Sequence, residues 1–230
     1  MTMTENNRPD AVSFEGIRCI LWDLDGTLIN SEPQHYRAWK RTVKRLYGVE
    51  DLDFEAYKAC IGTTLPVTVE IIGKICGRKL SEEEVVPEHL LDKRMLEEEE
   101  GFCPMPQAEK TVRKLYEKGL KMAVASSSPE EYLHRVAASL QIEDCLEACV
   151  SGIGCAHSKP APDVFLKAME ILGAKPEETL VVEDSENGVK AGLAAGCRVI
   201  AIDNPDSGDQ DIRPAHAIIK DLSQIPSLLA

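Results

Sequence analysis

Short apolar runs alternate along the chain with segments whose apolar positions have helical spacing. Five runs are rich in β-branched or small apolar residues, end at small or acidic residues, and predict strands: Ile17 to Asp23, Lys121 to Ser126, Ala148 to Ser151, Thr179 to Asp184, and Arg198 to Asp203. Helical patterns lie between most of them. Such alternation predicts an α/β fold in which helices cover both faces of a parallel sheet.

Two of the helical patterns indicate how helices pack on this sheet. The segment 162–173 has apolar residues at the spacing of one buried stripe and ends at Gly173. The segment after Ser185 carries small residues at four positions, namely Gly188, Ala191, Gly192 and Ala195. Small side chains let a helix approach a sheet closely, so we expect this helix to lie tightly against the strands.

The stretch from residue 31 to residue 101 has no convincing strand pattern. Ser31 to Gln34 has capping-box spacing and predicts a helix that ends at Gly48. Further helices are predicted at three places, Phe54 to Cys60, Pro66 to Cys76, and Glu82 to Glu100. We expect the last of them to be kinked or broken at Pro87.

These patterns divide the chain into a core and an insertion. We expect an α/β core domain formed by residues 16–30 and 102–230, a helical domain formed by residues 31–101, and a flexible N-terminus, residues 1–15. Gly and Pro residues near the two ends of the insertion are typical of hinges between compact units.

Composition narrows the class of protein. The chain has 230 residues, 43% of them apolar, which is enough for a real core and excludes disordered and fibrous proteins. Its net charge of −13 argues against nucleic acid and anionic membranes as partners. The sequence has neither an apolar membrane-spanning stretch nor a signal-peptide pattern, so we expect a cytoplasmic protein. Its 8 cysteines lie mostly in apolar runs and are interpreted as reduced, buried thiols.

Polar residues gather at the ends of the predicted strands: Asp23 and Asp25 after the first, Ser126 after the second, and Glu183 and Asp184 after the fourth. Parallel sheets place ligands beyond the carboxyl ends of their strands, so these side chains are expected to meet in one crevice. Converging carboxylates need a cation, and oxygen ligands suit Mg²⁺ together with a substrate phosphate. Lys159 adds a positive charge and Ser126 a hydroxyl donor. Together they predict a phosphate site.

In order and spacing, these residues resemble the four signature motifs of the haloacid dehalogenase-like superfamily. The motifs are Asp23-Leu-Asp25-Gly26-Thr27, Ser126, Lys159-Pro160 and Glu183-Asp184. The resemblance implies a Rossmann-like parallel sheet core with an inserted α-helical cap. The insertion is similar to the mobile cap of the subgroup that contains β-phosphoglucomutase and small sugar-phosphate phosphatases. Ser31 to His35 resembles the first cap hinge of that subgroup.

The resemblance also implies roles for the residues. Asp23 would attack phosphorus and form an aspartyl-phosphate, and Asp25 would protonate the leaving alcohol and then deprotonate water. Mg²⁺ would be held by the Asp23 carboxylate, the Asp25 backbone carbonyl and Asp184. Ser126, Lys159 and the backbone near Gly26 would bind the phosphoryl group. Glu183 would either ligate the metal through water or brace Lys159, and both roles stay open.

The expected activity is Mg²⁺-dependent hydrolysis of a small phosphorylated metabolite, such as a sugar phosphate, by a monomer. The alternative is a β-phosphoglucomutase-type phosphomutase, in which a sugar hydroxyl takes the phosphoryl group instead of water. Mutases of that subgroup place a lysine and an arginine around a cap glycine, whereas Gly62, Thr63 and Thr64 are uncharged here and are candidate substrate contacts. His35 is a candidate for cap closure.

Dehalogenation is a less favoured activity, and a catalytically dead binding module would be expected to lack a motif residue. The natural substrate stays open.

Other residues carry less specific signals. Cys145, Cys149, Cys155 and His157 could form a zinc site, but their spacing lacks close CxxC pairs and disfavours one. His89, His134 and His216 are expected at the surface. The acidic stretch from Asp203 to Asp211 lacks the ligand spacing of a calcium loop and is interpreted as a solvated loop.

Overall fold

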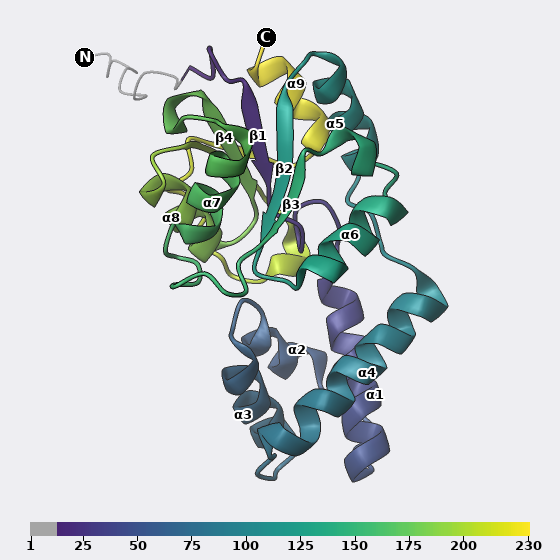
Figure 1. Ribbon diagram of the computed structural model, residues 1–230. Coiled ribbons are helices and arrows are strands. Elements are labelled where there is room, and N and C mark those ends of the chain that lie inside the picture. The colour runs from purple at the N-terminus through teal and green to yellow at the C-terminus, as the bar shows by residue number, and fades with distance from the viewer. Residues whose placement is uncertain (1–12) are drawn as a thin grey trace, which may run out of the picture.

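A parallel sheet forms the centre of the computed structural model, which describes residues 13–230 (Figure 1). In this part of the chain the sheet has 6 strands in the order β3-β2-β1-β4-β5-β6, and each neighbouring pair is parallel. The strands are β1 Cys19–Trp22, β2 Lys121–Ser126, β3 Ala148–Ser151, β4 Thr179–Glu183, β5 Arg198–Ile202 and β6 Ala217–Ile219. The predicted α/β class is therefore confirmed.

The predicted strands differ from the observed ones mainly at their carboxyl ends. β2 and β3 have the predicted bounds, whereas β1, β4 and β5 end one residue earlier than predicted. The residues left outside the ladder are Asp23, Asp184 and Asp203. Strand β6 was not predicted, because three residues at the sheet edge are too few to show an alternating pattern.

Helices cover both faces of the sheet, as the strand alternation requires. Trp22 and its neighbours on one face pack against α5, α6 and α9, while Leu21 and its neighbours on the other face pack against α7 and α8. These helices are α5 Ala108–Glu117, α6 Glu130–Ser139, α7 Asp163–Leu172, α8 Glu186–Ala194 and α9 Ile225–Leu228. Phe14 is buried in the first of these clusters, and residues 1–12 of the expected flexible N-terminus lie outside the described residues.

Helix α8 approaches the sheet closely, as its small residues predict. A Cβ atom at Gly192 would lie 2.9 Å from Val199 Cγ2, and one at Gly188 would lie 1.7 Å from Glu183 Oε1. Since real Cβ contacts are never so short, the two glycines are needed for this packing. The position of Gly188 lets the N-terminus of α8 lie directly beside the carboxylate of Glu183.

Residues 31–101, here called the cap segment, form a helical unit below the carboxyl edge of the sheet (Figure 1). Its helices are α1 Glu32–Tyr47, α2 Phe54–Tyr57, α3 Leu65–Ile75 and α4 Glu82–Glu100, with a 3₁₀ turn at Lys58–Cys60. They bury their own apolar cluster, which includes Trp39, Tyr57 and Ile72. The cap segment therefore has a core separate from those of the sheet, although its predicted domain boundaries stay a prediction.

Two local predictions in the cap segment were wrong in whole or in part, namely the capping box and the break at Pro87. Ser31 makes no side-chain capping bond, and Gln34 donates to the carbonyls of Leu96 and Gly101 instead of closing a capping box. Pro87 does not break α4, because it lies in the second turn of the helix and removes only one backbone hydrogen bond near the N-terminal end; a kink there stays a prediction.

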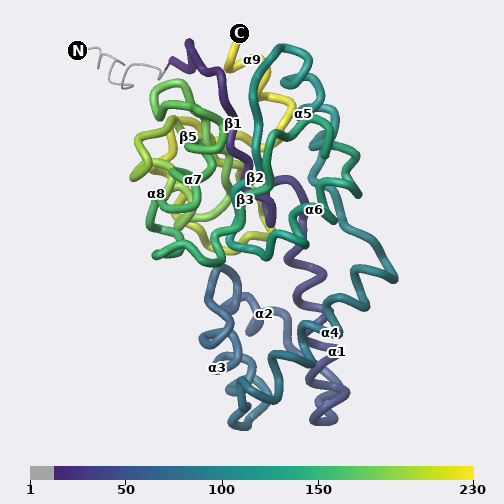
Figure 2. Tube along the Cα trace, in the orientation of Figure 1, coloured from purple at the N-terminus to yellow at the C-terminus, as the bar shows by residue number. Residues whose placement is uncertain are grey.

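The two chain connections between the core and the cap segment lie side by side. Asn30 N donates to Cys103 O at 2.8 Å, and Ile29 pairs with Pro104 in an isolated antiparallel bridge. Figure 2 shows the chain leaving the core and returning to it at neighbouring positions. The cap segment is therefore attached to the core at one place.

The histidines and cysteines depart partly from their predicted surroundings. His89 was predicted at the surface but is buried, with its ring stacked on Trp39 at 3.8 Å, because α1 and α4 pack together there. His134 is exposed as predicted, and His216 is half-buried with Nδ1 accepting from Val199 N. All 8 cysteines are free, and Cys103 is exposed, unlike the buried thiol that was predicted.

No zinc site forms from Cys145, Cys149, Cys155 and His157 in the described part of the chain. The only group there of three or more potential metal-ligating side chains is Asp23, Glu183 and Asp184. Among residues 13–230, no helix combines the length and the apolar character that crossing a membrane requires.

Candidate active site

A cavity of about 550 Å³ is lined by residues at the carboxyl edge of the sheet and by residues of the cap segment. Every site residue predicted from the sequence lines it: Asp23, Asp25, Gly26, His35, Gly62, Thr63, Thr64, Ser126, Lys159, Glu183 and Asp184. We call Asp23, Asp25, Lys159, Glu183 and Asp184 the core wall, and Glu32, His35 and residues 61–65 the cap wall. The sheet gathers the core wall because these residues lie at or beyond the ends of parallel strands, or in the loop before α7.

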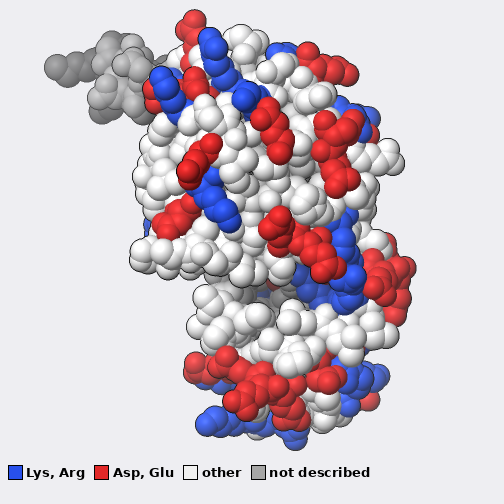
Figure 3. Space-filling view, viewed as in Figure 1, with Lys and Arg blue, Asp and Glu red and all other residues white. Residues whose placement is uncertain are grey.

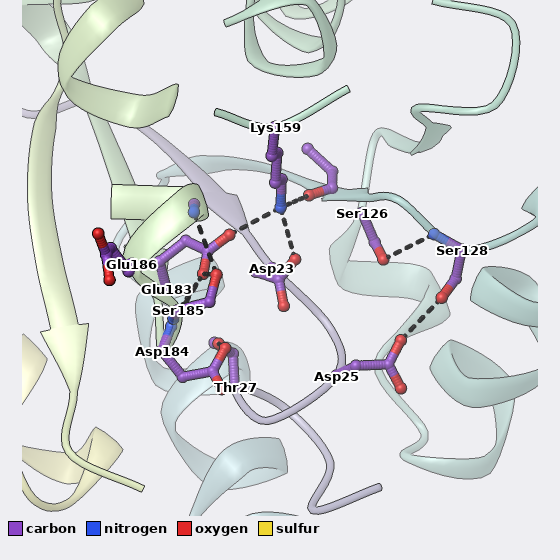
Figure 4. Close-up of polar contacts among 12 residues, drawn as sticks. Asp23, Asp25, Thr27, Ser126, Ser128, Lys159, Glu183, Asp184, Ser185 and Glu186 are labelled. Atoms are coloured by element: carbon purple, nitrogen blue, oxygen red, sulfur yellow. Dashed lines mark hydrogen bonds and ion pairs between the residues drawn. The ribbon is translucent and has the colours of Figure 1, made fainter. Parts of the chain in front are cut away.

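Lys159 joins the ends of two strands. Its Nζ donates to Asp23 Oδ1 at 2.6 Å and to Glu183 Oε1 at 2.7 Å, and it also donates to Ala125 O at 3.2 Å (Figure 4). Burial lowers the pKa of Lys159, but Asp23 and Glu183 outweigh it and raise the pKa above its usual value. Lys159 is therefore a fixed positive charge beside the Asp23 carboxylate.

Glu183 is fully buried, and both of its carboxylate oxygens have partners. Oε1 accepts from Lys159, and Oε2 accepts from the backbone N–H groups of Asp184 and Ser185, each at 3.0 Å, and from Ser185 Oγ at 2.9 Å. The carboxylate thus lies at the N-terminus of α8, where backbone N–H groups and the helix dipole stabilise negative charge. In this geometry the Glu183 carboxylate holds the Lys159 ammonium group in place and thus acts as its brace.

Asp184 lies on the other side of Asp23 from Asp25 (Figure 4). Thr27 Oγ1 donates to Asp184 Oδ1 at 3.2 Å, and Ser207 Oγ donates to Oδ2. A Cβ atom at Gly26 would lie 2.0 Å from Asp184 Oδ2, and Gly26 has a φ of +84°, so only glycine fits there. The glycine of the first motif therefore makes room for this carboxylate.

Three carboxylates with one ammonium group leave negative charge uncompensated. Asp23, Glu183 and Asp184 each offer an oxygen within 4.8 Å of the others. Burial, followed by the charge of Glu183, raises the pKa of Asp184 to about 7 and raises the pKa of Asp23 well above its usual value. A buried group of oxygen ligands with excess negative charge fits a hard divalent cation.

Asp25 points toward α6 rather than toward Asp184 (Figure 4). Ser128 Oγ donates to its Oδ2 at 2.8 Å, and the Tyr132 hydroxyl donates to its Oδ1 at 2.9 Å. Burial raises the pKa of Asp25, but Lys93, His35 and Ser128 outweigh it and hold the pKa below its usual value. Asp25 is thus a hydrogen-bonded carboxylate in this arrangement.

Ser126 lies at the end of β2 with its side chain almost fully buried. Its Oγ accepts from Ser128 N at 3.1 Å, which leaves the hydroxyl hydrogen available to a ligand. The next two serines also line the cavity, so the chain turns around it here.

The cap wall is less polar than the core wall. Thr63 Oγ1 donates to Cys60 O at 2.7 Å and contacts Thr68 Oγ1 at 2.8 Å, so this hydroxyl is already engaged within the cap segment. Burial, assisted by Lys93, lowers the pKa of His35 to about 3, so its ring is neutral at pH 7. Glu32 lies in the first turn of α1, where its Oε1 accepts from the Tyr57 hydroxyl at 2.7 Å.

The segment 203–211 was interpreted as a solvated loop, which is wrong for several of its residues. Ser207 and Asn204 are buried, and Asn204 Nδ2 donates to Gly26 O at 3.0 Å. Gln210 Oε1 accepts from Glu186 N at 3.0 Å, and a Cβ atom at Gly62 would lie 2.9 Å from Gln210 Nε2. The segment 203–211 therefore contacts both walls of the cavity. Its position directly after β5 was the signal available in the sequence.

Comparison with known proteins agrees with this geometry. Residues 20–202 match the family model described as haloacid dehalogenase-like hydrolase. A phosphoglycolate phosphatase from Aquifex aeolicus is 33% identical over 184 residues, which cover 79% of this chain and 83% of that protein. Hexitol phosphatase A from Escherichia coli is 32% identical over 194 residues, covering 82% of this chain and 85% of the relative.

Solved structures share the fold. The crystal structure of CbbY from Rhodobacter sphaeroides in complex with phosphate has a TM-score of 0.76 at 24% identity, covering 91% of this chain and 96% of that chain. The family match covers strands β2 to β5, nearly all of β1, the cap segment and every residue of the core wall. The chain that carries this cavity therefore belongs to the haloacid dehalogenase-like hydrolases.

Proposed function

We propose that the protein is a Mg²⁺-dependent phosphatase that hydrolyses a small phosphate monoester through an aspartyl-phosphate on Asp23. The observation that carries the proposal is the arrangement of Lys159, Asp23 and Asp184 at one edge of the sheet. The buried Asp23 carboxylate has the Lys159 ammonium group on one side, and the Asp184 carboxylate lies close enough to share a metal ion with it. Such an arrangement suits phosphoryl transfer.

The donor set fits Mg²⁺. The Asp23 carboxylate, the Asp25 backbone carbonyl and Asp184 would hold it, since all three offer oxygen, which Mg²⁺ prefers. When bound, the ion neutralises charge between the nucleophile and the phosphate dianion. Glu183 is left as the brace for Lys159, because each of its oxygens already has a protein donor.

Asp23 acts as the nucleophile. Lys159 binds its Oδ1, which leaves Oδ2 to attack phosphorus while the bond from phosphorus to the alcohol oxygen breaks. The product of this half-reaction is an acyl phosphate on Asp23 and a free alcohol. In the second half-reaction water attacks the same phosphorus and releases phosphate and the Asp23 carboxylate.

Asp25 moves the proton in both half-reactions. Because its pKa is held below the usual value, Asp25 must take up a proton before the first half-reaction. It then gives this proton to the leaving alcohol oxygen, and as a carboxylate it takes a proton from the attacking water. Because Ser128 and Tyr132 bind both of its oxygens, Asp25 must release at least one of these hydrogen bonds to reach the substrate.

Three further groups bind the phosphoryl oxygens. The Lys159 ammonium supplies charge, the Ser126 hydroxyl supplies a donor, and the backbone near Gly26 is open to close approach because that residue has no side chain. These donors are held by the fold before substrate binds, so little reorganisation is needed as charge develops.

Similarity to named phosphatases supports hydrolysis of small phosphorylated metabolites. The phosphomutase alternative is not favoured, since residues 61–65 carry no cation to hold a second phosphate. We infer that the active form is a cytoplasmic monomer. Size-exclusion chromatography with light scattering tests the oligomeric state.

The test of the proposal is hydrolysis of para-nitrophenyl phosphate with and without Mg²⁺. We expect Asp23→Asn to lower kcat by about a thousandfold or more, because the amide is a poor nucleophile. Asp144→Asn, at an exposed site paired with Arg113, is the matched control and is expected to keep full activity. Acid quenching during turnover should recover phosphate covalently bound to the wild-type protein. Full activity of Asp23→Asn, or in excess EDTA, would refute the mechanism.

A further inference from the structure

The two walls of the cavity differ in charge. The core wall holds four carboxylates and the Lys159 ammonium group. The cap wall presents hydroxyl, alkyl and backbone groups from residues 61–65 together with Glu32 and the neutral His35 ring. In the space-filling view, uncharged surface borders the notch between the core and the cap segment on the left, and a cluster of Lys, Arg, Asp and Glu side chains borders it on the right (Figure 3).

Lys159 is the only lysine or arginine that lines the cavity in the described part of the chain. Its side chain is 8% exposed and is bound to Asp23 at 2.6 Å and to Glu183 at 2.7 Å. It serves the phosphoryl group that is being transferred and has no capacity for a second anion. The remainder of a substrate thus extends toward a wall whose lining residues include no lysine or arginine.

Glu32 adds an acidic group to this wall, and burial raises its pKa above the usual value. Its carboxylate lines the cavity, and its hydrogen bond comes from the neutral Tyr57 hydroxyl rather than from a cation. Carboxylate oxygens accept hydrogen bonds from alcohols but repel a carboxylate or phosphate at the same distance. A second anionic group would lose its hydration without gaining an ion pair.

We propose that the substrate is a phosphate monoester of a neutral, polyhydroxylated alcohol, and that the cap wall excludes substrates with a second anionic group. The inference rests on the proposed function and narrows it. It separates the two kinds of relative described above, because glycolate carries a carboxylate and a hexitol does not. Hydroxyl groups of the alcohol would find partners in Glu32, Thr64, Asn187 and Gln210, which all line the cavity.

The test compares kcat/KM for pairs of substrates that differ in one anionic group. Fructose 1-phosphate is paired with fructose 1,6-bisphosphate, and glycerol 3-phosphate with 3-phosphoglycerate. We expect the neutral member of each pair to be preferred by about tenfold or more. The preference should shrink as salt is added, because screening weakens the repulsion that causes it.

A charge-introducing variant tests the cause of the preference. Thr64→Arg adds a cation to the cap wall and is expected to reduce the preference in both pairs by at least about threefold. Thr64→Gln, which adds length without charge, is its matched control and is expected to leave the preference near the wild-type value.

Equal or faster turnover of the anionic members by the wild-type enzyme overturns the inference. A preference that Thr64→Arg and Thr64→Gln change equally also overturns it, since charge would then not be the cause. Hydrolysis of para-nitrophenyl phosphate tests the proposed phosphatase activity separately from the proposed substrate class. If that ester is hydrolysed while anionic members are preferred, only the substrate class fails; if it is not hydrolysed, the proposed function fails with it.

Discussion

The core wall and the cap wall face the same cavity but are held in place differently. Each carboxylate of the core wall accepts hydrogen bonds from neighbouring groups, and Lys159 ties Asp23 to Glu183 across two strands. The loop of the cap wall, residues 61–65, is exposed over most of its length and touches the core through Gln210. Reacting groups need fixed positions, whereas groups that select a substrate can lie on a loop, where sequence changes have little effect on the stability of the fold.

The largest effect is expected from removing the charge that organises the core wall. Lys159→Met keeps the length of the side chain but leaves Asp23 and Glu183 buried without a cation. We expect kcat to fall by about a thousandfold and the free energy of unfolding to fall by about 3 to 5 kcal/mol. Steady-state kinetics and denaturant unfolding measure the two effects. Lys167→Met, at an exposed site, is the control. Activity within tenfold of wild type would show that Lys159 does not organise this wall.

A smaller effect, on stability alone, is expected inside the cap segment. Burial lowers the pKa of His89 to about 3 from an ordinary value of 6.5, so below about pH 6.5 the unfolded chain binds a proton that the folded chain does not. Acidification from about pH 7 to about pH 5 therefore lowers the free energy of unfolding, by about 2 kcal/mol for this group.

His89→Phe keeps a ring against Trp39 and removes the titration. We expect this variant to lose about 2 kcal/mol less than wild type over the same pH interval, measured by urea unfolding. His134→Phe, at an exposed position, should follow the wild-type pH dependence. Identical slopes for His89→Phe and wild type would mean that His89 is protonated in the folded protein.

The smallest effect is expected where the two walls meet. Gly62→Ala places a methyl group against Gln210 and forces alanine into a φ of +74°. We expect kcat/KM to fall by about tenfold, and the double variant Gly62→Ala/Gln210→Ala to recover part of the loss. Gly77→Ala has a φ of +64° with no atom within 4 Å of the added methyl, and it measures the backbone strain alone. No recovery in the double variant would mean that the contact with Gln210 does not limit the site.

Sequence patterns were sufficient for strands β1 to β5 and for the convergence of the core wall. The residues of β2 and β3 are mostly apolar, and the motif residues at strand ends need only parallel strands to bring them together. The order of Asp23, Ser126, Lys159 and Asp184 along the chain therefore already implied one cavity.

Contacts between distant segments were not predictable in the same way. Ser207 and Asn204 are ordinary turn residues in sequence, and only the path of the chain after β5 brings them to Asp184 and Gly26. Likewise, His89 lies among charged residues of α4, so its burial becomes visible only once α1 packs on that face. Such cases depend on tertiary packing that periodicity does not encode.

The neighbouring entry and exit of residues 31–101 have a consequence for how such enzymes change. Because the backbone of Asn30 is hydrogen-bonded to that of Cys103 and Ile29 pairs with Pro104, the segment begins and ends at neighbouring positions of the core. Exchanging it for a shorter, longer or differently folded module would leave the strands and their ladder intact. A change of the cap segment at this junction can therefore alter substrate specificity while the core keeps its structure.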